Sequence, residues 1–132
     1  MAKRVIIVHT LEHAKMALKA AAELNKPVTL QSAPDAIFYA GSLYLWQMFE
    51  QAKIYHPGVS AQFILDCGDA GAEAIAAIGI GHKHIRVHDP KLQDIAKQHG
   101  VQVHSEPYEA LDLLYTRDTK AACTQWLRKE IL

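Results

Sequence analysis

The chain has 132 residues, a length typical of one domain, and we expect a single α/β domain over residues 1–132. Its 14 lysine and arginine residues equal its 14 aspartate and glutamate residues, so its formal charge is zero. A neutral chain lacks the basic surface that attracts nucleic acid or anionic lipid, so we expect no nucleic-acid partner and no membrane partner.

The first predicted strand covers residues 5–8, a continuous β-branched run typical of a strand buried on both faces. The run is too short for a signal peptide or a membrane span, and we expect neither. His9 and Thr10 follow it, and Thr10 can cap a helix whose apolar residues recur at helical spacing. Asn25 and Pro27 end that helix, and a second short strand is expected over residues 28–30.

Residues 36–55 are unusually aromatic, and between residues 43 and 49 only Gln47 is polar. A helix that is apolar on nearly all sides is either buried within its own chain or covered by a partner. We expect a homo-oligomer that buries part of this segment between subunits, namely Tyr44, Trp46, Met48 or Phe49. The alternative is cover within one chain, by the loop at residues 31–35 and the C-terminal helix.

The rest of the chain continues the alternation of strands and helices. Strands are expected over residues 61–66, 85–88 and 101–104. Helices are expected over residues 72–78, after Asp89, over 107–115 and from Thr119 onward. Five strand–helix units with connections long enough for parallel crossovers predict a three-layer α/β/α sandwich. The expected five-stranded parallel sheet has the flavodoxin-like, doubly wound order 2-1-3-4-5.

Polar residues follow four of these strands at the point where each strand ends. In the expected order these four strands are neighbours, so the residues share the carboxyl edge of the sheet. Imidazole and carboxylate groups at one edge suit proton transfer or, alternatively, metal ligation. No H-x-x-x-H or H-E-x-x-H pair is present, so no metal is assigned, and each histidine could simply bond a loop carbonyl. The candidate catalytic residues are His9, Asp66, His88 and His104.

Residues 66–71 form a strand–loop–helix junction of the kind that often binds ligands in α/β sheets. Its backbone N–H groups could hold an anion, but Asp66 and Asp69 would repel one and fit a cation, hydroxyl or amine donor better. Asp69 could also be an ordinary helix cap, and Cys67 a buried thiol. No glycine-rich nucleotide motif is present, so the cofactor is unknown. The candidate ligand-binding residues are Thr10, Ser32, Cys67, Gly68, Asp69, Gly71, Asp89 and Ser105.

The run Ile64-Leu65-Asp66 resembles the phosphoacceptor strand of response-regulator receiver domains, which have a similar length and strand order. Receivers have an acidic pair after their first strand, where this chain has His9-Thr10. They have a lysine after their fifth strand, where this chain has His104-Ser105. The resemblance therefore implies a fold analogy and no phosphorylation chemistry.

Two functions remain open from the sequence. The first is a small polar-ligand-binding α/β protein or enzyme that uses histidine and aspartate at the carboxyl edge for binding or proton transfer. The second is a non-catalytic homo-oligomeric assembly or regulatory module that uses residues 36–55 as its working surface. The two distant cysteines, Cys67 and Cys123, are not a disulfide framework and favour the cytoplasm.

Overall fold

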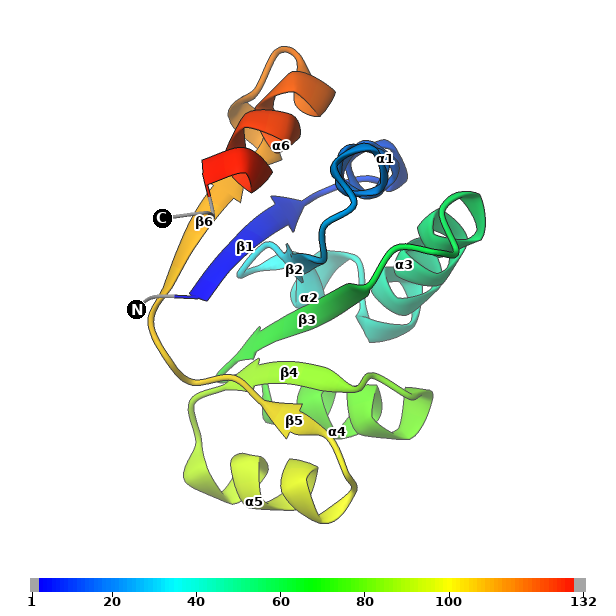
Figure 1. Cartoon of the computed structure of the whole chain (residues 1–132). Coiled ribbons are helices and arrows are strands. Elements are labelled where there is room, and N and C mark those ends of the chain that lie inside the picture. The colour runs from blue at the N-terminus through cyan, green and yellow to red at the C-terminus, as the bar shows by residue number, and fades with distance from the viewer. Residues whose placement is uncertain (1–2, 130–132) are drawn as a thin grey trace.

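A computed structural model describes residues 3–129 as a parallel sheet flanked by helices, which confirms the α/β class (Figure 1). The strands are β1 Lys3–Val8, β2 Val28–Ser32, β3 Ala61–Gly68, β4 His84–Val87, β5 Gln102–Val103 and β6 Tyr108–Asp112. The helices are α1 Leu11–Leu24, α2 Ala36–Tyr39, α3 Ser42–Tyr55, α4 Gly71–Ile80, α5 Pro90–Gln98 and α6 Thr119–Arg128, with a 3-10 turn, η1, at Leu113–Tyr115.

The strand order is β5-β4-β3-β2-β1-β6, so the expected five-stranded order 2-1-3-4-5 is wrong. Each of the first four crossovers moves the chain to the next neighbouring position, and β3 therefore pairs with β2 rather than with β1. As a result β2 lies inside the sheet and not near its edge. The apolar runs mark the strands in either arrangement, but they do not specify which strands become neighbours.

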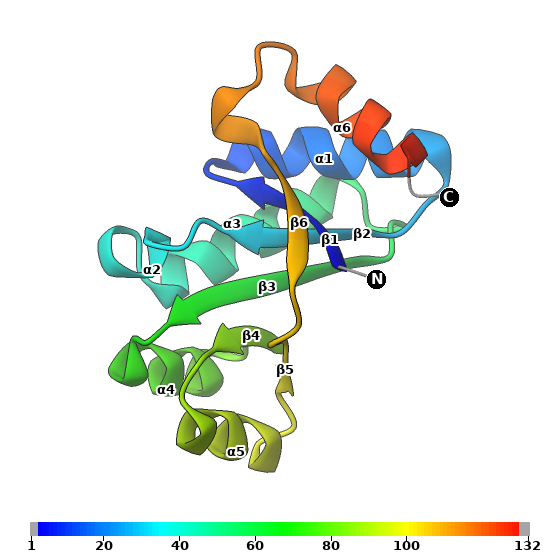
Figure 2. The same ribbon diagram turned by 90° about the vertical axis from the view of Figure 1, so that its left-hand side faces the viewer.

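Residues 107–115, expected to be helical, instead form β6 and η1. β6 pairs in parallel with β1, and the hydrogen bond from the Lys3 N–H to the Pro107 carbonyl (3.2 Å) begins this pairing. The segment has little helical periodicity, and pairing with the otherwise open edge of β1 decides its conformation. Figure 2 shows β6 crossing in front of β1 and β2.

The connection from β5 to β6 joins the two edges of the sheet through only four residues, 104–107. An extended chain from Val103 to Tyr108 reaches about 17 Å. Six strands in a flat sheet would place the edge strands about 24 Å apart. The sheet must therefore be strongly curved, which brings its two edges toward each other and makes one of its faces concave.

The strand register assigns side chains to the two faces of the sheet. Ile7, Gln31 and Ile64 are in register on one face, and Asp66 is paired with Arg86 on that same face, because residues two apart on a strand point the same way. On the opposite face Phe63 stacks on Phe49 of α3. Along the sheet α1 packs against α6 and α3, α3 against α4, and α4 against α5.

The aromatic segment at residues 36–55 is two helices, because Gly41 takes a left-handed conformation (φ 84°) between them. Met48 and Phe49 are buried within one chain, so of the four side chains expected at a subunit interface only Tyr44 and Trp46 remain accessible for one. Trp46 is partly buried and packs 5.0 Å from the His82 ring. Within residues 3–129, no helix combines the length and apolar character needed to cross a membrane.

Candidate functional site

The carboxyl edge of the sheet contains a cavity of about 430 Å³, which we call the carboxyl-edge cavity. The ends of β3 and β4, the start of β6 and the segment that leads into α2 line it. Its residues are Pro34, Asp35, Phe38, Asp66, Cys67, Gly68, Asp69, Arg86, His88 and Tyr108. Five residues that the sequence suggested as candidates therefore share one cavity, namely Asp66, Cys67, Gly68, Asp69 and His88.

Asp66 is the most deeply placed carboxylate of this cavity, with 6% of its surface exposed. Its backbone N–H donates to the Ser32 hydroxyl (2.9 Å), and one carboxylate oxygen accepts from the Gly68 N–H (3.1 Å). Gly68 has φ 52°, a left-handed conformation that glycine adopts without strain. Burial raises the pKa of Asp66, against the lowering effects of the Gly68 N–H and the Arg86 charge. The local fold thus holds one carboxylate in a fixed orientation.

Arg86 is the buried cation of the cavity, and the sequence interpretation missed it. Its Nε donates to Gln31 Oε1 (3.3 Å) and its Nη1 donates to the Glu106 carbonyl (2.8 Å). The guanidinium lies 4.3 Å from the centre of the Tyr108 ring. Among residues 3–129, Arg86 Nη2 and Gln31 Nε2 are buried without a hydrogen-bond partner. A charged residue inside an apolar strand was the available signal, because charge is rarely buried without a partner.

His88 and Asp69 lie at the exposed mouth of the cavity, with 3.3 Å between His88 Nδ1 and Asp69 Oδ1. Ser105 borders an adjoining hollow that also contains Arg86 and His88. The other candidate ligand-binding residues have local structural roles. Thr10 caps α1, Asp89 caps α5, and Gly71 begins α4, where an added Cβ would lie 3.7 Å from the Leu92 side chain.

His9 and His104 make contacts away from the carboxyl-edge cavity. His9 Nε2 lies 2.6 Å from Asp112 Oδ1, which joins the ends of β1 and β6. His104 is buried, and its Nε2 lies 3.1 Å from His84 Nδ1. The short β5 runs beside the start of β4, so His104 lies level with the middle of the sheet rather than at its rim. Asp112 comes from the segment that was expected to be a helix, and His84 lies just before the expected strand at residues 85–88.

The His84–His104 pair predicts a pH dependence of stability. Burial lowers the pKa of both histidines below 6.5, aided by the charges of Lys3 and, at His84, Lys83, whereas Glu106 raises the pKa of His104. Folding therefore lowers the proton affinity of these two histidines. The unfolded chain binds more protons than the folded one, so the free energy of unfolding decreases as the pH falls below 6.5. Urea unfolding should give a smaller free energy at about pH 5.5 than at about pH 7.5. The decrease should be smaller in His104→Gln than in the unaltered protein. An equal decrease in the two proteins would show that the His84–His104 pair does not cause the pH dependence.

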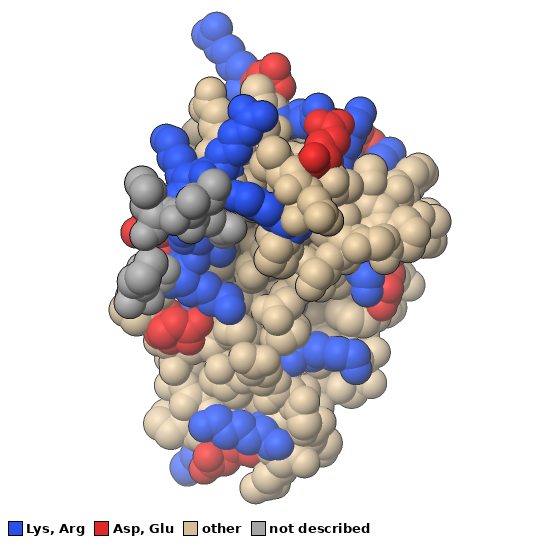
Figure 3. Space-filling model, viewed as in Figure 1, with Lys and Arg blue, Asp and Glu red and all other residues tan. Residues whose placement is uncertain are grey.

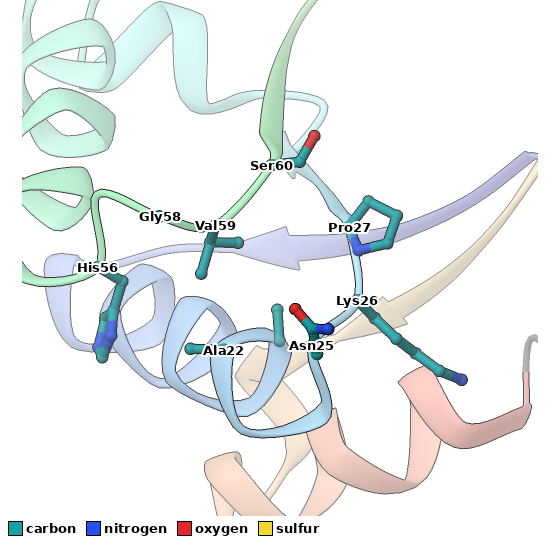
Figure 4. A pocket seen from close by; sticks show the side chains of 9 residues that line it. Ala22, Asn25, Lys26, Pro27, His56, Gly58, Val59 and Ser60 are labelled. Atoms are coloured by element: carbon teal, nitrogen blue, oxygen red, sulfur yellow. The ribbon is translucent and has the colours of Figure 1, made fainter.

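A second cavity, of about 400 Å³, lies at the opposite edge of the sheet (Figure 4). Its lining comes from the end of α1 and the turn before β3, and includes Asn25, Lys26, His56 and Ser60. The Lys26 ammonium donates to the Leu127 carbonyl (2.9 Å). None of these lining side chains is a buried charge, which distinguishes this cavity from the one at the carboxyl edge. Across residues 3–129, no group of three or more His, Cys, Asp or Glu side chains is arranged to hold a metal ion.

Comparison with known proteins shows a distant similarity to an enzyme. No protein-family model matches the chain. Over 80 residues it is 30% identical to a fructose-bisphosphate aldolase of Giardia intestinalis. The aligned part is 61% of this chain and 25% of the aldolase, so the chain spans about a quarter of that relative's length. This coverage does not show family membership, and the aldolase activity is a property of that relative.

Proposed function

We propose that the protein binds a small polar ligand in the carboxyl-edge cavity. The observation that carries the proposal is the buried Asp66 carboxylate in the wall of an open cavity, with buried Arg86 beside it on the next strand. Small-molecule sites typically combine a concave apolar wall with a few fixed polar groups. Buried ionisable groups in such a cavity are also candidates for chemistry.

Each residue has a distinct part in this proposal. Asp66 accepts hydrogen bonds from the ligand and is the group that takes up a proton if the site catalyses a reaction. Arg86 donates hydrogen bonds, and His88 at the mouth contributes a second titratable group. His9 and His104 lie outside the cavity, so the proposed site rests on Asp66 and His88 among the four candidate catalytic residues. The aldolase similarity favours a small, oxygen-rich ligand, without assigning a reaction.

The substitution Asp66→Asn tests the proposed function. Asparagine keeps an acceptor for the Gly68 N–H but removes the charge, so we expect ligand affinity to fall about tenfold or more while the fold is retained. A thermal-shift screen of polar metabolites, with and without divalent metals, would identify ligands, and calorimetry would compare the variants. Asp94→Asn, at an exposed aspartate of α5, is the matched control. Equal binding by the two variants would contradict the role of Asp66.

As a second candidate function, we propose self-association through α2 and the start of α3. Four apolar or aromatic side chains there are more than half exposed: Phe38 (66%), Tyr39 (71%), Leu43 (53%) and Tyr44 (54%). Exposed apolar groups gathered on adjacent turns favour an interface. α2 lies on the far side of the view in Figure 1, and the opposite face, drawn in Figure 3, instead gathers lysine and arginine side chains over α1 and α6. Light scattering at micromolar concentration should give an oligomer that Tyr44→Glu converts to monomer. A monomeric mass for the unaltered protein would contradict it.

We also propose the cytoplasm as the compartment in which the protein works. Cys67 and Cys123 are both free and buried. Burial raises the pKa of each thiol to about 12, so neither thiol is reactive. Free, unreactive thiols are compatible with a reducing compartment. Cell fractionation should therefore recover the protein with the cytosol, and recovery from an oxidising compartment would contradict this proposal.

A further inference from the structure

We propose that the carboxyl-edge cavity binds a neutral, polyhydroxylated compound of monosaccharide size. The inference rests on the proposed ligand-binding function and names the chemical class of the ligand. It follows from three properties of the cavity wall: its hydrogen-bonding groups, its charges and its aromatic rings.

The hydrogen-bonding groups of the wall require a ligand that both donates and accepts. The carboxylates of Asp35, Asp66 and Asp69 only accept hydrogen bonds when ionised. The guanidinium of Arg86 only donates hydrogen bonds, and Arg86 as a whole residue is 4% exposed. Its Nη2 has no hydrogen-bond partner within residues 3–129 and is itself fully buried, so it can donate to a ligand once the wall around it opens slightly. A hydroxyl group serves either kind of partner, and several hydroxyls on one small molecule serve both.

The charges of the wall disfavour ionic ligands. Three carboxylates against one guanidinium make the cavity unfavourable for a phosphate or another anion. A cation that approached Asp66 would meet Arg86, which is its neighbour on β4. A neutral ligand avoids both repulsions.

Two aromatic side chains provide the apolar part of the wall. Phe38 of α2 and Tyr108 of β6 both line the cavity, and Phe38 is 66% exposed. The C–H faces of a sugar ring pack on aromatic rings while its hydroxyls bond to groups at the ring's edge. The volume of about 430 Å³ lies within the range of small-molecule sites and accommodates one such ring.

Saturation-transfer NMR with the full chain tests the inference with four probes: D-fructose, D-ribose, D-fructose 6-phosphate and putrescine. We expect signals from the neutral sugars and weaker binding of the phosphate and the diamine. Phe38→Ala should weaken sugar binding about three- to tenfold through loss of ring packing. Tyr39→Ala is the matched control, because Tyr39 is the next aromatic residue of α2, is 71% exposed and does not line the cavity.

The outcomes separate this inference from the proposed function. Sugar binding that Phe38→Ala weakens and Tyr39→Ala leaves unchanged would support it. Preferred binding of the phosphate or of putrescine, lost in Asp66→Asn, would overturn the ligand class and leave the carboxyl-edge site standing. Sugar binding that neither Phe38→Ala nor Asp66→Asn alters would place the sugar elsewhere and overturn the inference. Binding of none of the probes would also overturn it, and the wider metabolite screen would then decide the proposed function by itself.

Discussion

Phe49→Ala should lower the free energy of unfolding by about 3–5 kcal/mol, as truncation of a buried aromatic residue does when a cavity is left behind. Phe49 of α3 is buried, and its ring stacks on Phe63 of β3 with 5.2 Å between ring centres. This contact packs α3 against β3. Because small domains have only about 5–15 kcal/mol of stability in total, the variant should be close to unfolding. Urea titration followed by circular dichroism measures the change.

Phe38→Ala is the matched control for this substitution. It removes the same ring from a site that is 66% exposed, so its effect on the free energy of unfolding should be within about 0.5 kcal/mol. Equal stabilities for the two variants would show that the Phe49–Phe63 contact does not hold α3 on the sheet. A normal stability for Phe49→Ala together with a changed oligomeric mass would instead favour burial between subunits.

Arg86→Met should lower the free energy of unfolding by about 2–4 kcal/mol, because hydrogen bonds to charged groups are among the stronger ones. The variant removes donors from Gln31 Oε1 and from the Glu106 carbonyl. It also removes the guanidinium from the Tyr108 ring, where β6 begins. Arg86 thereby joins β4 to the connection that closes the curved sheet, and its loss should loosen that connection. Chemical denaturation measures the stability, and amide hydrogen exchange at residues 104–108 measures the loosening.

Arg86→Lys separates the charge of this residue from its geometry. Lysine keeps the positive charge but lacks the planar fork that reaches two partners at once, so an intermediate stability is expected. Methionine and arginine are similar enough in length for the apolar part of the side chain to remain packed. A methionine variant that is as stable as the unaltered protein would mean that the two hydrogen bonds make no net contribution. Unchanged amide hydrogen exchange at residues 104–108 in Arg86→Met would show that Arg86 does not hold the β5–β6 connection to β4.

The sequence alone determined the local structure of most of the chain. The apolar runs before His9 and Asp66 became β1 and β3, because continuous apolar segments are stable only where both faces are covered. Thr10 and Asp89 cap the helices that follow them, because the cap hydrogen bonds join residues two or three apart and need no tertiary contact. Part of the candidate site was predictable for the same reason, since Asp66 near the end of β3 and Asp69 just after it are only three residues apart.

The tertiary structure alone decided strand order, the conformation of residues 107–115 and the membership of the site. Strand order depends on which edges meet, and β6 exists because β1 offered an edge to pair with. The curvature of the sheet and the short β5 place His104 beside His84 and away from Asp66. Arg86 joins Asp66 through the register of β3 and β4, which separate parts of the chain form together. Such pairings are non-local, so a local pattern of residues identifies the elements but not their neighbours.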